Sequence, residues 1–599
     1  MTSVWNTEAF PEVSREAWRR RVREELGGKE PETLATQLPG GLEVQPLYDG
    51  DGTVVERILP GRSKAGPRPW RLAVEVSGEP AEAAARVERD LARGADLLWL
   101  PADLLDDLDQ VLAPVDSETT ALVFDSEDRV AVAADRWAVW VAGKDLDPSR
   151  LEGGLGGDPF GTWARRGKLG RPMDEVWQEL GEVAARCAEE APGMRAALVS
   201  TVAYHGAGAA ITDELALGVA SGLETLRQLM ASGLSVDQAA EQILFSMAVD
   251  SDLFVEIAKL RAAQRLWAKV VAACGGGAEA RRMRIHATTS EASWTARAPW
   301  LNLLRGGVQG FGAAVAGVWS LRIDPYDRAL GVASDAARRH AISTHHLLAE
   351  EAHLGRVADP AAGSGALEGL TDQIARRSWE RVQQIEEMGG MAEVLEHGEV
   401  HIWIENAAEE RDVALARRRT VIVGVNEFAD LDEERPEREP SSEVVEEDPK
   451  AFRAWRRSRP YEALHSAAEA WEKEHGRRPR IAQVSLGPLA EHGPRADFVR
   501  RFFACGGVEV VLLEKVEDFV NDDCEGVVFC GKDERYGQGV PELAAALREA
   551  GAERLFLAGR PDAETTEALR EAGVKVFVHL GCDAFGILEN LLSDLGVQP

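Results

Sequence analysis

The sequence predicts an α/β protein built as a (β/α)8 TIM barrel followed by a smaller, flavodoxin-like doubly wound domain. Two observations lead to this expectation. Short apolar runs alternate with amphipathic stretches over residues 68–375, and a region of about 300 residues with that rhythm is typical of an eight-stranded parallel barrel. The alternation returns over residues 479–599, where about five strand and helix repeats fit a doubly wound sheet.

Composition is that of an ordinary globular protein. The 599 residues are 45% hydrophobic and 28% charged, which excludes global disorder. With 68 Lys and Arg against 101 Asp and Glu, the formal net charge is −33, and a charge of that sign repels nucleic acid and anionic lipid. No stretch has the pattern of a signal peptide or a membrane-spanning helix. We therefore expect a cytoplasmic protein with no nucleic-acid or membrane partner.

The region 1–67 is expected to lie outside both domains. Trp18 to Leu26 has the spacing of one amphipathic helix, and residues 41–52 have the composition of an extended arm. An arm that belongs to neither domain needs a surface to pack on, so we expect it to contact another subunit.

Strands and helices of the barrel are predicted in alternation. Short apolar runs predict buried strands at Trp70–Val76, Leu97–Leu100, Thr120–Val123, Ala196–Ser200 and Met283–Ala287. Helical spacing of apolar residues predicts helices at Pro80–Arg93, Asp213–Ala231, Val236–Phe245 and Leu253–Ala273.

Residues 376–478 are expected to be a helical linker region that contains an acidic tether. Residues 429–450 hold ten acidic residues, three basic residues and three prolines, with few large apolar side chains. Such a stretch cannot bury enough apolar surface to offset its ordering entropy, so it is predicted to be solvated.

The C-terminal domain shows the clearest alternation. Strands are predicted at Ile481–Leu486, Val508–Leu513, Gly526–Cys530, Leu555–Ala558 and Val574–Leu580. Helices are predicted at Ala496–Ala504, Pro541–Ala550, Ala563–Ala572 and Ala584–Leu595, and the second and third of them end on glycines.

Several segments resemble the methylmalonyl-CoA mutase family, the adenosylcobalamin-dependent acyl-CoA mutases. They are FVEIAKLRAAQRLWAK (Phe254–Lys269), RIHATTSEASWT (Arg284–Thr295), Ala358–Trp379, Ile385–Met391 and TVIVGVNEF (Thr420–Phe428). The opening helix and the arm LATQLPGGLEVQPLY resemble the small, or β, subunit of the bacterial heterodimeric enzyme.

The resemblance implies both an architecture and a chemistry. The family has a barrel whose axis holds the acyl-CoA, capped by a flavodoxin-like cobalamin-binding domain. It catalyses a radical rearrangement between methylmalonyl-CoA and succinyl-CoA, in which the cofactor supplies the reaction and the protein positions it. The small subunit has the large, catalytic subunit as its heterodimer partner, and adenosylcobalamin is then expected on that partner.

The cobalamin motif of the family, D-x-H-x-x-G, is incomplete in this chain. In the corresponding stretch His492 is present, but Ala490 stands where the family has the Asp that orients the imidazole, and Arg495 stands where it has the Gly. The later S-x-L is absent, and the Gly-Gly pair is reduced to Gly559 followed by Arg560. We therefore expect no cobalamin and no metal on this chain, with His492 and Gly559 as vestigial candidates.

The barrel motifs are eroded as well. The family's T-x-R-Q-Y-A-G-F has no counterpart near residues 69–78, and its R-L-S-F-F, which contacts CoA, is replaced by Gln242-Ile243-Leu244-Phe245-Ser246. Tyr204 and His205 are kept, but two residues closer to the following Ala-Gly pair, and catalytic groups do not tolerate such a shift. His286 keeps its place. No catalytic residue is expected, and these three are vestigial candidates.

The sequence therefore predicts a non-catalytic small subunit that stabilises the heterodimer of an adenosylcobalamin-dependent mutase. Two alternatives remain. The chain could be a divergent acyl-CoA mutase that uses His492, or its C-terminal sheet could sense CoA or a nucleotide through Arg495, Lys532 and Arg560.

Overall fold

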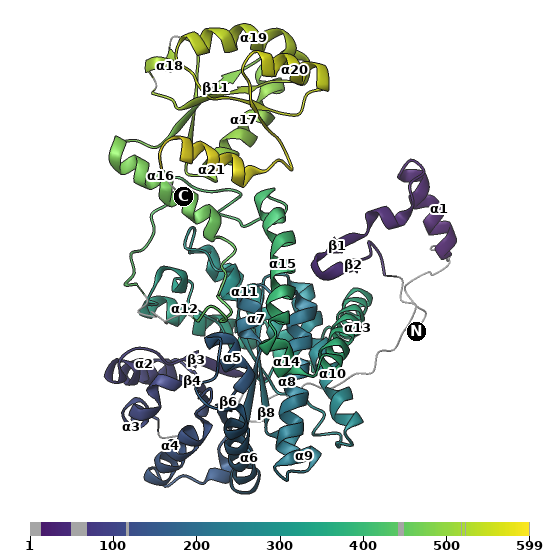
Figure 1. Cartoon of the computed structure of the whole chain (residues 1–599), viewed down its shortest axis with the longest axis vertical. Helices are drawn as coiled ribbons and strands as arrows, with labels where there is room; N and C mark the ends of the chain where they lie inside the picture. The colour runs from purple at the N-terminus through teal and green to yellow at the C-terminus, as the bar shows by residue number, and fades with distance from the viewer. Residues whose placement is uncertain are drawn as a thin grey trace, which may run out of the picture.

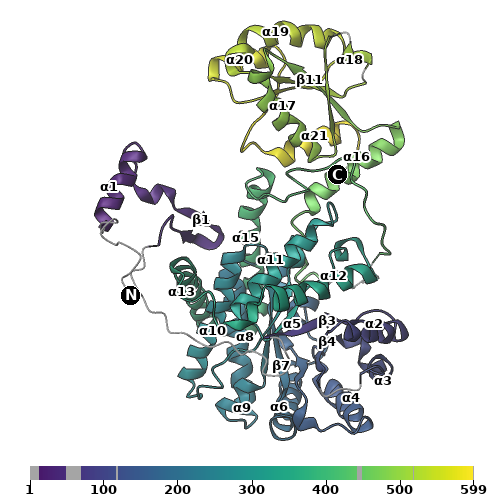
Figure 2. The ribbon, with the colours of Figure 1, turned by 180° about the vertical axis from the view of Figure 1, so that it is seen from behind.

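The computed structural model describes residues 13–48, 69–115, 119–440, 448–516, 518–521 and 523–597. A barrel domain and a C-terminal sheet domain lie at opposite ends of the molecule, and α16 (Arg459–His475) runs between them (Figures 1 and 2). An N-terminal arm projects from the side of the barrel (Figure 1). Within the described residues, no helix is both long and apolar enough to cross a membrane.

Eight parallel strands close into a barrel in the order β10-β3-β4-β5-β6-β7-β8-β9, which confirms the predicted TIM barrel. The strands are β3 (Arg71–Glu75), β4 (Leu97–Pro101), β5 (Ala121–Asp125), β6 (Gly153–Gly157), β7 (Met194–Ser200), β8 (Ile243–Val249), β9 (Ile285–Thr289) and β10 (Ser320–Arg322).

Helices cover the outside of the barrel, and all but the last two of them lie between these strands in the sequence. They are α2 (Pro80–Ala92), α3 (Leu108–Val111), α4 (Val130–Gly143), α5 (Pro159–Arg166), α6 (Met173–Glu190), α7 (Val202–Gly206), α8 (Ile211–Ala231), α9 (Val236–Glu241), α10 (Leu253–Ala273), α11 (Leu301–Ala316), α12 (Asp335–His346) and α13 (Gly365–Glu387).

One predicted helix, Val236–Phe245, was wrong in its second half. A capping box between Ser235 and Gln238 begins a helix there, but α9 ends at Glu241 and β8 begins at Ile243. The apolar residues from Ile243 onward fit either a helix or a strand by periodicity, and barrel pairing with β7 and β9 decides for the strand.

Strand β6 gave no apolar signal because it reads Gly-Gly-Leu-Gly-Gly. A Cβ at Gly153 would lie 1.9 Å from the carbonyl oxygen of Leu122, and one at Gly156 would lie 1.7 Å from that of Phe124. Gly156 also has a φ of +74°. Close backbone approach between β5 and β6 therefore requires glycine at both positions.

Two further helices, α14 (Met391–Glu396) and α15 (Glu399–Ala416), follow the barrel. Parts of the predicted acidic tether lie against the barrel domain. Arg438 pairs with Asp327 at 2.7 Å, and a Glu433 carboxylate oxygen accepts a hydrogen bond from the Ala298 amide at 2.7 Å. Residues 441–447 of the tether lie outside the described residues.

The C-terminal domain is a five-stranded parallel sheet in the order β12-β11-β13-β14-β15, which is the flavodoxin-like order. The strands are β11 (Arg480–Ser485), β12 (Glu509–Leu512), β13 (Gly526–Cys530), β14 (Leu555–Ala558) and β15 (Val576–Val578). The helices after α16 are α17 (Leu489–Ala504), α18 (Asp518–Asn521), α19 (Asp533–Glu549), α20 (Ala563–Glu571) and α21 (Ala584–Asp594). Helices α16, α17 and α21 cover one face of the sheet, while α19 and α20 cover the other.

The described part of the N-terminal arm contains α1 (Arg15–Glu25), a short 3-10 turn at Pro31–Leu34 and a hairpin of β1 (Thr36–Leu38) and β2 (Leu42–Val44). The hairpin lies against α13, where the Gln373 side chain accepts a hydrogen bond from the Glu43 amide at 3.0 Å and donates one to its carbonyl oxygen at 2.9 Å. Leu42 is buried in the barrel core. By contrast, α1 contains no buried residue and lies away from the body of the molecule (Figure 1).

Two helix glycines predict opposite effects on stability. A Cβ at Gly222 of α8 would lie 2.8 Å from the Phe245 ring and 3.0 Å from the Trp267 ring, whereas nothing lies within 4 Å of one at Gly307 of α11. Gly222→Ala should therefore lower the free energy of unfolding by about 1–3 kcal/mol. Gly307→Ala should raise it by about 0.5–1 kcal/mol through helix propensity. Urea unfolding followed by circular dichroism measures both, and a stabilised Gly222→Ala variant would contradict this account of the packing.

Candidate functional site

Two regions of this fold carry the predicted site residues. One is the carboxyl edge of the C-terminal sheet, and the other is the carboxyl mouth of the barrel together with its axis. Both are the places where α/β folds of these two kinds build their sites.

At the edge of the C-terminal sheet, the Arg495 guanidinium lies across the ends of β13 and β14. It donates to the Gly531 carbonyl oxygen at 2.5 Å and to the Tyr536 hydroxyl at 2.9 Å, and it pairs with Asp533 at 2.8 Å. Gly559 sits directly beneath it, because a Cβ there would lie 2.9 Å from the guanidinium carbon. The predicted candidate Gly559 is thus covered by Arg495.

Tyr536 fixes this arrangement from below. Its side chain is fully buried, and its hydroxyl donates to the Ala558 carbonyl oxygen at 2.5 Å while accepting from the Gly531 amide at 3.0 Å. Burial raises the pKa of the Tyr536 hydroxyl to about 12. We call Arg495 and Tyr536 the arginine–tyrosine plug.

His492 lies in the first turn of α17, which begins at Leu489, rather than in the open loop expected before Ala496. Its Nδ1 atom is buried and makes no hydrogen bond within the described part of the chain. The neighbouring carboxylate, Glu491, turns away to Arg535 at 2.5 Å and Lys532 at 3.7 Å. No acid therefore orients the imidazole among the described residues.

The three cations suggested for nucleotide sensing do not converge as free charges. Arg495 is bound in the plug, Lys532 pairs with Glu491, and Arg560 is exposed on the loop after β14. Among the described residues, no cluster of His, Cys, Asp and Glu side chains could hold a metal ion.

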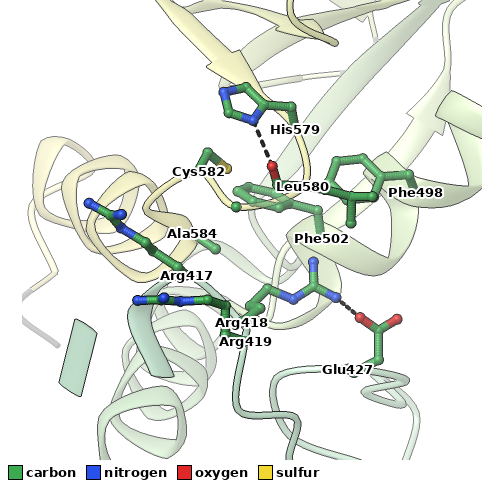
Figure 3. Close-up of a pocket in the computed structure, with 11 residues that line it drawn as sticks. Arg417, Arg418, Arg419, Glu427, Phe498, Phe502, His579, Leu580, Cys582 and Ala584 are labelled. Atoms are coloured by element: carbon green, nitrogen blue, oxygen red, sulfur yellow. Dashed lines mark hydrogen bonds and ion pairs between the residues drawn. The ribbon is translucent and has the colours of Figure 1, made fainter. Parts of the chain in front are cut away.

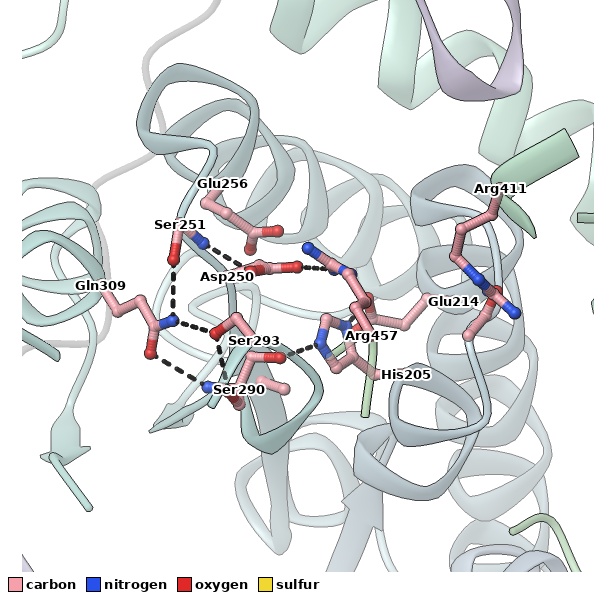
Figure 4. Close-up of polar contacts among 12 residues, drawn as sticks. His205, Glu214, Asp250, Ser251, Glu256, Ser290, Ser293, Gln309, Arg411 and Arg457 are labelled. Carbon is pink, nitrogen blue, oxygen red and sulfur yellow. Dashed lines mark hydrogen bonds and ion pairs between the residues drawn. The ribbon is translucent and has the colours of Figure 1, made fainter. Parts of the chain in front are cut away.

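The barrel mouth contains a buried polar network around His205, which α7 carries just beyond β7 (Figure 4). His205 Nδ1 lies 3.1 Å from a Glu214 oxygen, and its Nε2 lies 2.7 Å from the Ser290 hydroxyl. Glu214 also binds the ammonium of Lys259 at 3.1 Å. Lys259 in turn pairs with Glu256 at 2.8 Å and donates to the Ala248 carbonyl oxygen at 2.7 Å.

The charges of this network are balanced internally. Burial would raise the pKa of Glu214, but Lys259 and His205 outweigh burial and lower it to about 2. Burial raises the pKa of Glu256, and the two carboxylates together raise the pKa of Lys259 despite its burial. The charged groups of this network thus pair with one another inside the protein.

Residues 448–458, which we call the mouth strap, cross the carboxyl mouth of the barrel. The amides of Phe452, Trp455 and Arg457 donate to backbone carbonyls of Ala164, Gly206 and Ala292 at 2.8, 2.7 and 3.0 Å. The Arg457 guanidinium enters the mouth and pairs with Asp250, whose pKa is lowered to about 2 by Arg457 against the effect of burial (Figure 4).

Tyr204 lies under this strap. Its ring is 1% exposed and meets the Phe452 ring edge-on, with centroids 5.3 Å apart, and burial raises the pKa of its hydroxyl. The hydroxyl makes no hydrogen bond within the described residues. Tyr204 and His205 are therefore neighbours in the fold, but one packs in the core and the other joins the polar network.

Sequence reasoning missed most of this network. Gln309 links it to α11, since its amide nitrogen donates to Ser293 at 2.7 Å and Ser251 at 3.1 Å, and its oxygen accepts from the Ser290 amide at 3.2 Å. A signal was present in the charged residues Glu256 and Lys259, which interrupt an otherwise apolar face of α10.

Bulky side chains fill the barrel axis. Seven come from the strands and Trp319 directly precedes β10, and together they form a cluster of their own: Ala73, Leu97, Trp99, Ala121, Val123, Leu198, Leu244 and Trp319. His286 stacks on Trp99 at 4.2 Å and bonds through Nδ1 to the Ser320 hydroxyl at 2.7 Å, and burial lowers its pKa far below the ordinary value.

The amino-terminal end of the axis is closed by an ionic cluster. Glu152 pairs with Arg71 at 2.7 Å and with Arg284 at 3.3 Å, and it accepts a hydrogen bond from the Trp319 indole at 3.1 Å. Together with the tryptophans, this cluster packs the axis along its length.

The depressed pKa values predict where acid destabilises the fold. Glu214 and Asp250, with pKa values of about 2, stabilise the native state above about pH 4.5 and lose that contribution as the pH falls toward 2. The urea midpoint of the chain should therefore fall steeply between about pH 4.5 and 3, and less steeply for Asp250→Asn.

A matched substitution of a solvent-exposed carboxylate, Asp497→Asn, should keep the pH dependence of the unmodified chain. Equal pH dependence of the urea midpoint in Asp250→Asn and the unmodified chain would mean that Asp250 does not have the assigned role.

Comparison with known proteins agrees with the resemblance seen in the sequence. A family model described as methylmalonyl-CoA mutase matches residues 99–485. The methylmalonyl-CoA mutase small subunit of Streptomyces virginiae is 35% identical, over 98% of this chain and 98% of its own length. That of Porphyromonas gingivalis is 29% identical over the same shares, and the methylmalonyl-CoA mutase of Escherichia coli is 28% identical over 69% of this chain and 63% of its own. This chain belongs to the methylmalonyl-CoA mutase family.

Proposed function

We propose that this chain is the non-catalytic small subunit of an adenosylcobalamin-dependent methylmalonyl-CoA mutase. In this role it stabilises a heterodimer whose large subunit binds the cofactor and interconverts methylmalonyl-CoA and succinyl-CoA. The observation that carries the proposal is the arginine–tyrosine plug, which occupies the sheet edge where the family's cofactor would lie. The names of the full-length relatives, which call them small subunits, support it.

The residues at the sheet edge do not fit a corrinoid. A lower axial imidazole needs an acceptor on its other nitrogen to fix its orientation and basicity. Here the position two residues before His492 is Ala490, the adjacent Glu491 is bound to Arg535, and Nδ1 of His492 is buried without a partner among the described residues. Arg495 also fills the space above Gly559.

The barrel likewise does not fit an acyl-CoA along its axis. Trp99, Trp319 and their neighbours are each at most 6% exposed and occupy the interior between the two ends. To enter this space, a CoA chain would have to displace buried indoles and break the Glu152 ion pairs. Breaking them costs free energy because buried charges would be left unpaired.

We also propose that the N-terminal region, residues 1–67, contributes to subunit contact. Within the described residues, the hairpin is anchored on this chain at Leu42 and Gln373, and Tyr48 packs against Gly365 and Gly369 of α13, while α1 has no buried residue. A helix left without a partner surface is suited to packing on a second subunit. Residues 68–375, 376–478 and 479–599 would then be the mutase-like barrel, the linker region and the degenerate cobalamin-binding-like domain.

The cofactor part of this proposal predicts a division of labour. Purified alone, the chain should give no cobalamin difference spectrum and no mutase activity, because its groove is filled. Mixed with the cognate large subunit, it should give both. In the assembled complex His492→Ala should leave turnover within about twofold, since no ligand role is assigned to it.

A loss of turnover by orders of magnitude in His492→Ala, with the complex still assembled on gel filtration, would instead support a divergent mutase that is active in its own right. Activity of the separate chain would do the same. Tyr461→Phe, a buried substitution at a residue that belongs to neither site, serves as the control for general damage.

The arm predicts a separable effect on assembly. Deleting residues 1–30 removes α1 but keeps the hairpin and its contacts with α13. The thermal midpoint of the lone chain should stay within about 2 °C, because α1 buries nothing on this chain. Its affinity for the large subunit should fall at least about tenfold in surface plasmon resonance. Unchanged affinity would exclude α1 from the interface.

A further inference from the structure

A pocket outside both sites lies where the end of α15 meets the C-terminal domain (Figure 3). Its volume is about 230 Å³. We call it the arginine pocket, and its lining residues are Arg417, Arg418, Arg419, Glu427, Phe498, Phe502, His579, Leu580, Gly581, Cys582 and Ala584. It lies beside the loop after β15, and α17, the helix that also carries His492, contributes Phe498 and Phe502 to its wall.

The middle arginine, Arg418, bonds to other groups of the protein. Arg418 has a left-handed backbone with a φ of +54°, donates through Nε to the Asn426 carbonyl oxygen at 2.7 Å and pairs with Glu427. Glu427 is also 3.4 Å from Arg501. The carboxylate that lines the pocket is therefore already neutralised by two guanidinium groups.

The two flanking arginines have no such role. Arg417 and Arg419 are exposed, and within the described residues neither side chain makes an ion pair or hydrogen bond. Figure 3 shows both side chains extending to the same side of the pocket, away from Glu427. In a chain of net charge −33, two unpaired guanidinium groups at one pocket form a local cationic site.

The facing wall is apolar. Phe502 forms a buried floor beside Phe498, with ring centroids 6.0 Å apart, and Leu580 stands at the rim with 88% of its surface exposed. A leucine so exposed beside aromatic rings offers surface that a flat ligand would cover. At about 230 Å³ the pocket is below the range of about 300–1,000 Å³ usual for drug-sized ligands, so a ligand of that size would be held in part and would leave the rest of its surface exposed.

We propose that the arginine pocket binds a phosphate monoester that carries a flat heteroaromatic ring, which is the chemistry of a mononucleotide. The guanidinium groups of Arg417 and Arg419 would hold the phosphate oxygens, the arrangement to which arginine is best suited. Phe498 and Leu580 would cover the ring. Because α15 and the C-terminal domain both contribute, the ligand would stabilise their contact. None of this requires the subunit role proposed above.

Calorimetric titration of the full chain with AMP, inorganic phosphate and adenosine tests the proposal. AMP should bind saturably, and the other two probes should bind at least about tenfold more weakly, because each lacks one half of the recognised chemistry. Arg417→Gln/Arg419→Gln should weaken AMP binding at least about tenfold. Leu580→Ala, at a position too exposed to affect folding, should weaken it about two- to fivefold.

The matched control is Arg560→Gln/Lys575→Gln, which removes two exposed cations from the same domain. It should leave AMP affinity unchanged. Any of three results would overturn the proposal: no saturable AMP binding at millimolar ligand, equal weakening by the control pair, or inorganic phosphate binding as tightly as AMP. If the arginine double variant does not fold, the relative affinities of AMP, inorganic phosphate and adenosine and the effect of Leu580→Ala still test the proposal.

Discussion

The guanidinium of Arg495 is the group on which the interpretation of the C-terminal domain depends. It bridges the ends of β13 and β14 through the Gly531 carbonyl oxygen and the Tyr536 hydroxyl, and it lies directly over Gly559. A planar cation with several fixed donors is held firmly by such a set of acceptors. To open this edge for a large planar ligand, the chain would have to break these bonds and expose the buried phenol of Tyr536.

In the barrel, too, the protein's own side chains occupy the place where a ligand would bind. Asp250 and Glu214, which face the mouth, are paired with Arg457 and Lys259, and the axis behind them is packed with indole and aliphatic side chains. These carboxylates form ion pairs with cations of the same chain instead of facing a substrate. Side chains thus fill the barrel axis and cover the sheet edge, which supports the non-catalytic role proposed above.

The architecture could be predicted from the sequence because strands buried on both faces appear as short apolar runs. Glycines between the runs mark where neighbouring elements end. The five C-terminal strands and α10 lie where their patterns indicated, α10 to the residue. Sequence reasoning missed β6, where glycines required by close backbone contact remove the apolar signal, and β8, where the run from Ile243 fits either element. It also missed β10, which has only three residues.

The candidate site was predicted less completely. The absence of a motif residue, such as the acid before His492, can be recognised from the sequence because the comparison needs only spacing. The residues that occupy the two sites instead could not be predicted, since Tyr536 and Arg457 reach their positions through long-range packing. The two unpaired arginines beside Leu580 were not singled out by the sequence, because adjacent arginines usually indicate only a solvated surface.

Locating cobalt directly would test the central claim. Anomalous diffraction at the cobalt edge from crystals of the complex with its large subunit and adenosylcobalamin should show cobalt on the large subunit, with no peak within bonding distance of His492. A cobalt peak on His492, with Arg495 displaced from Gly559, would contradict the account.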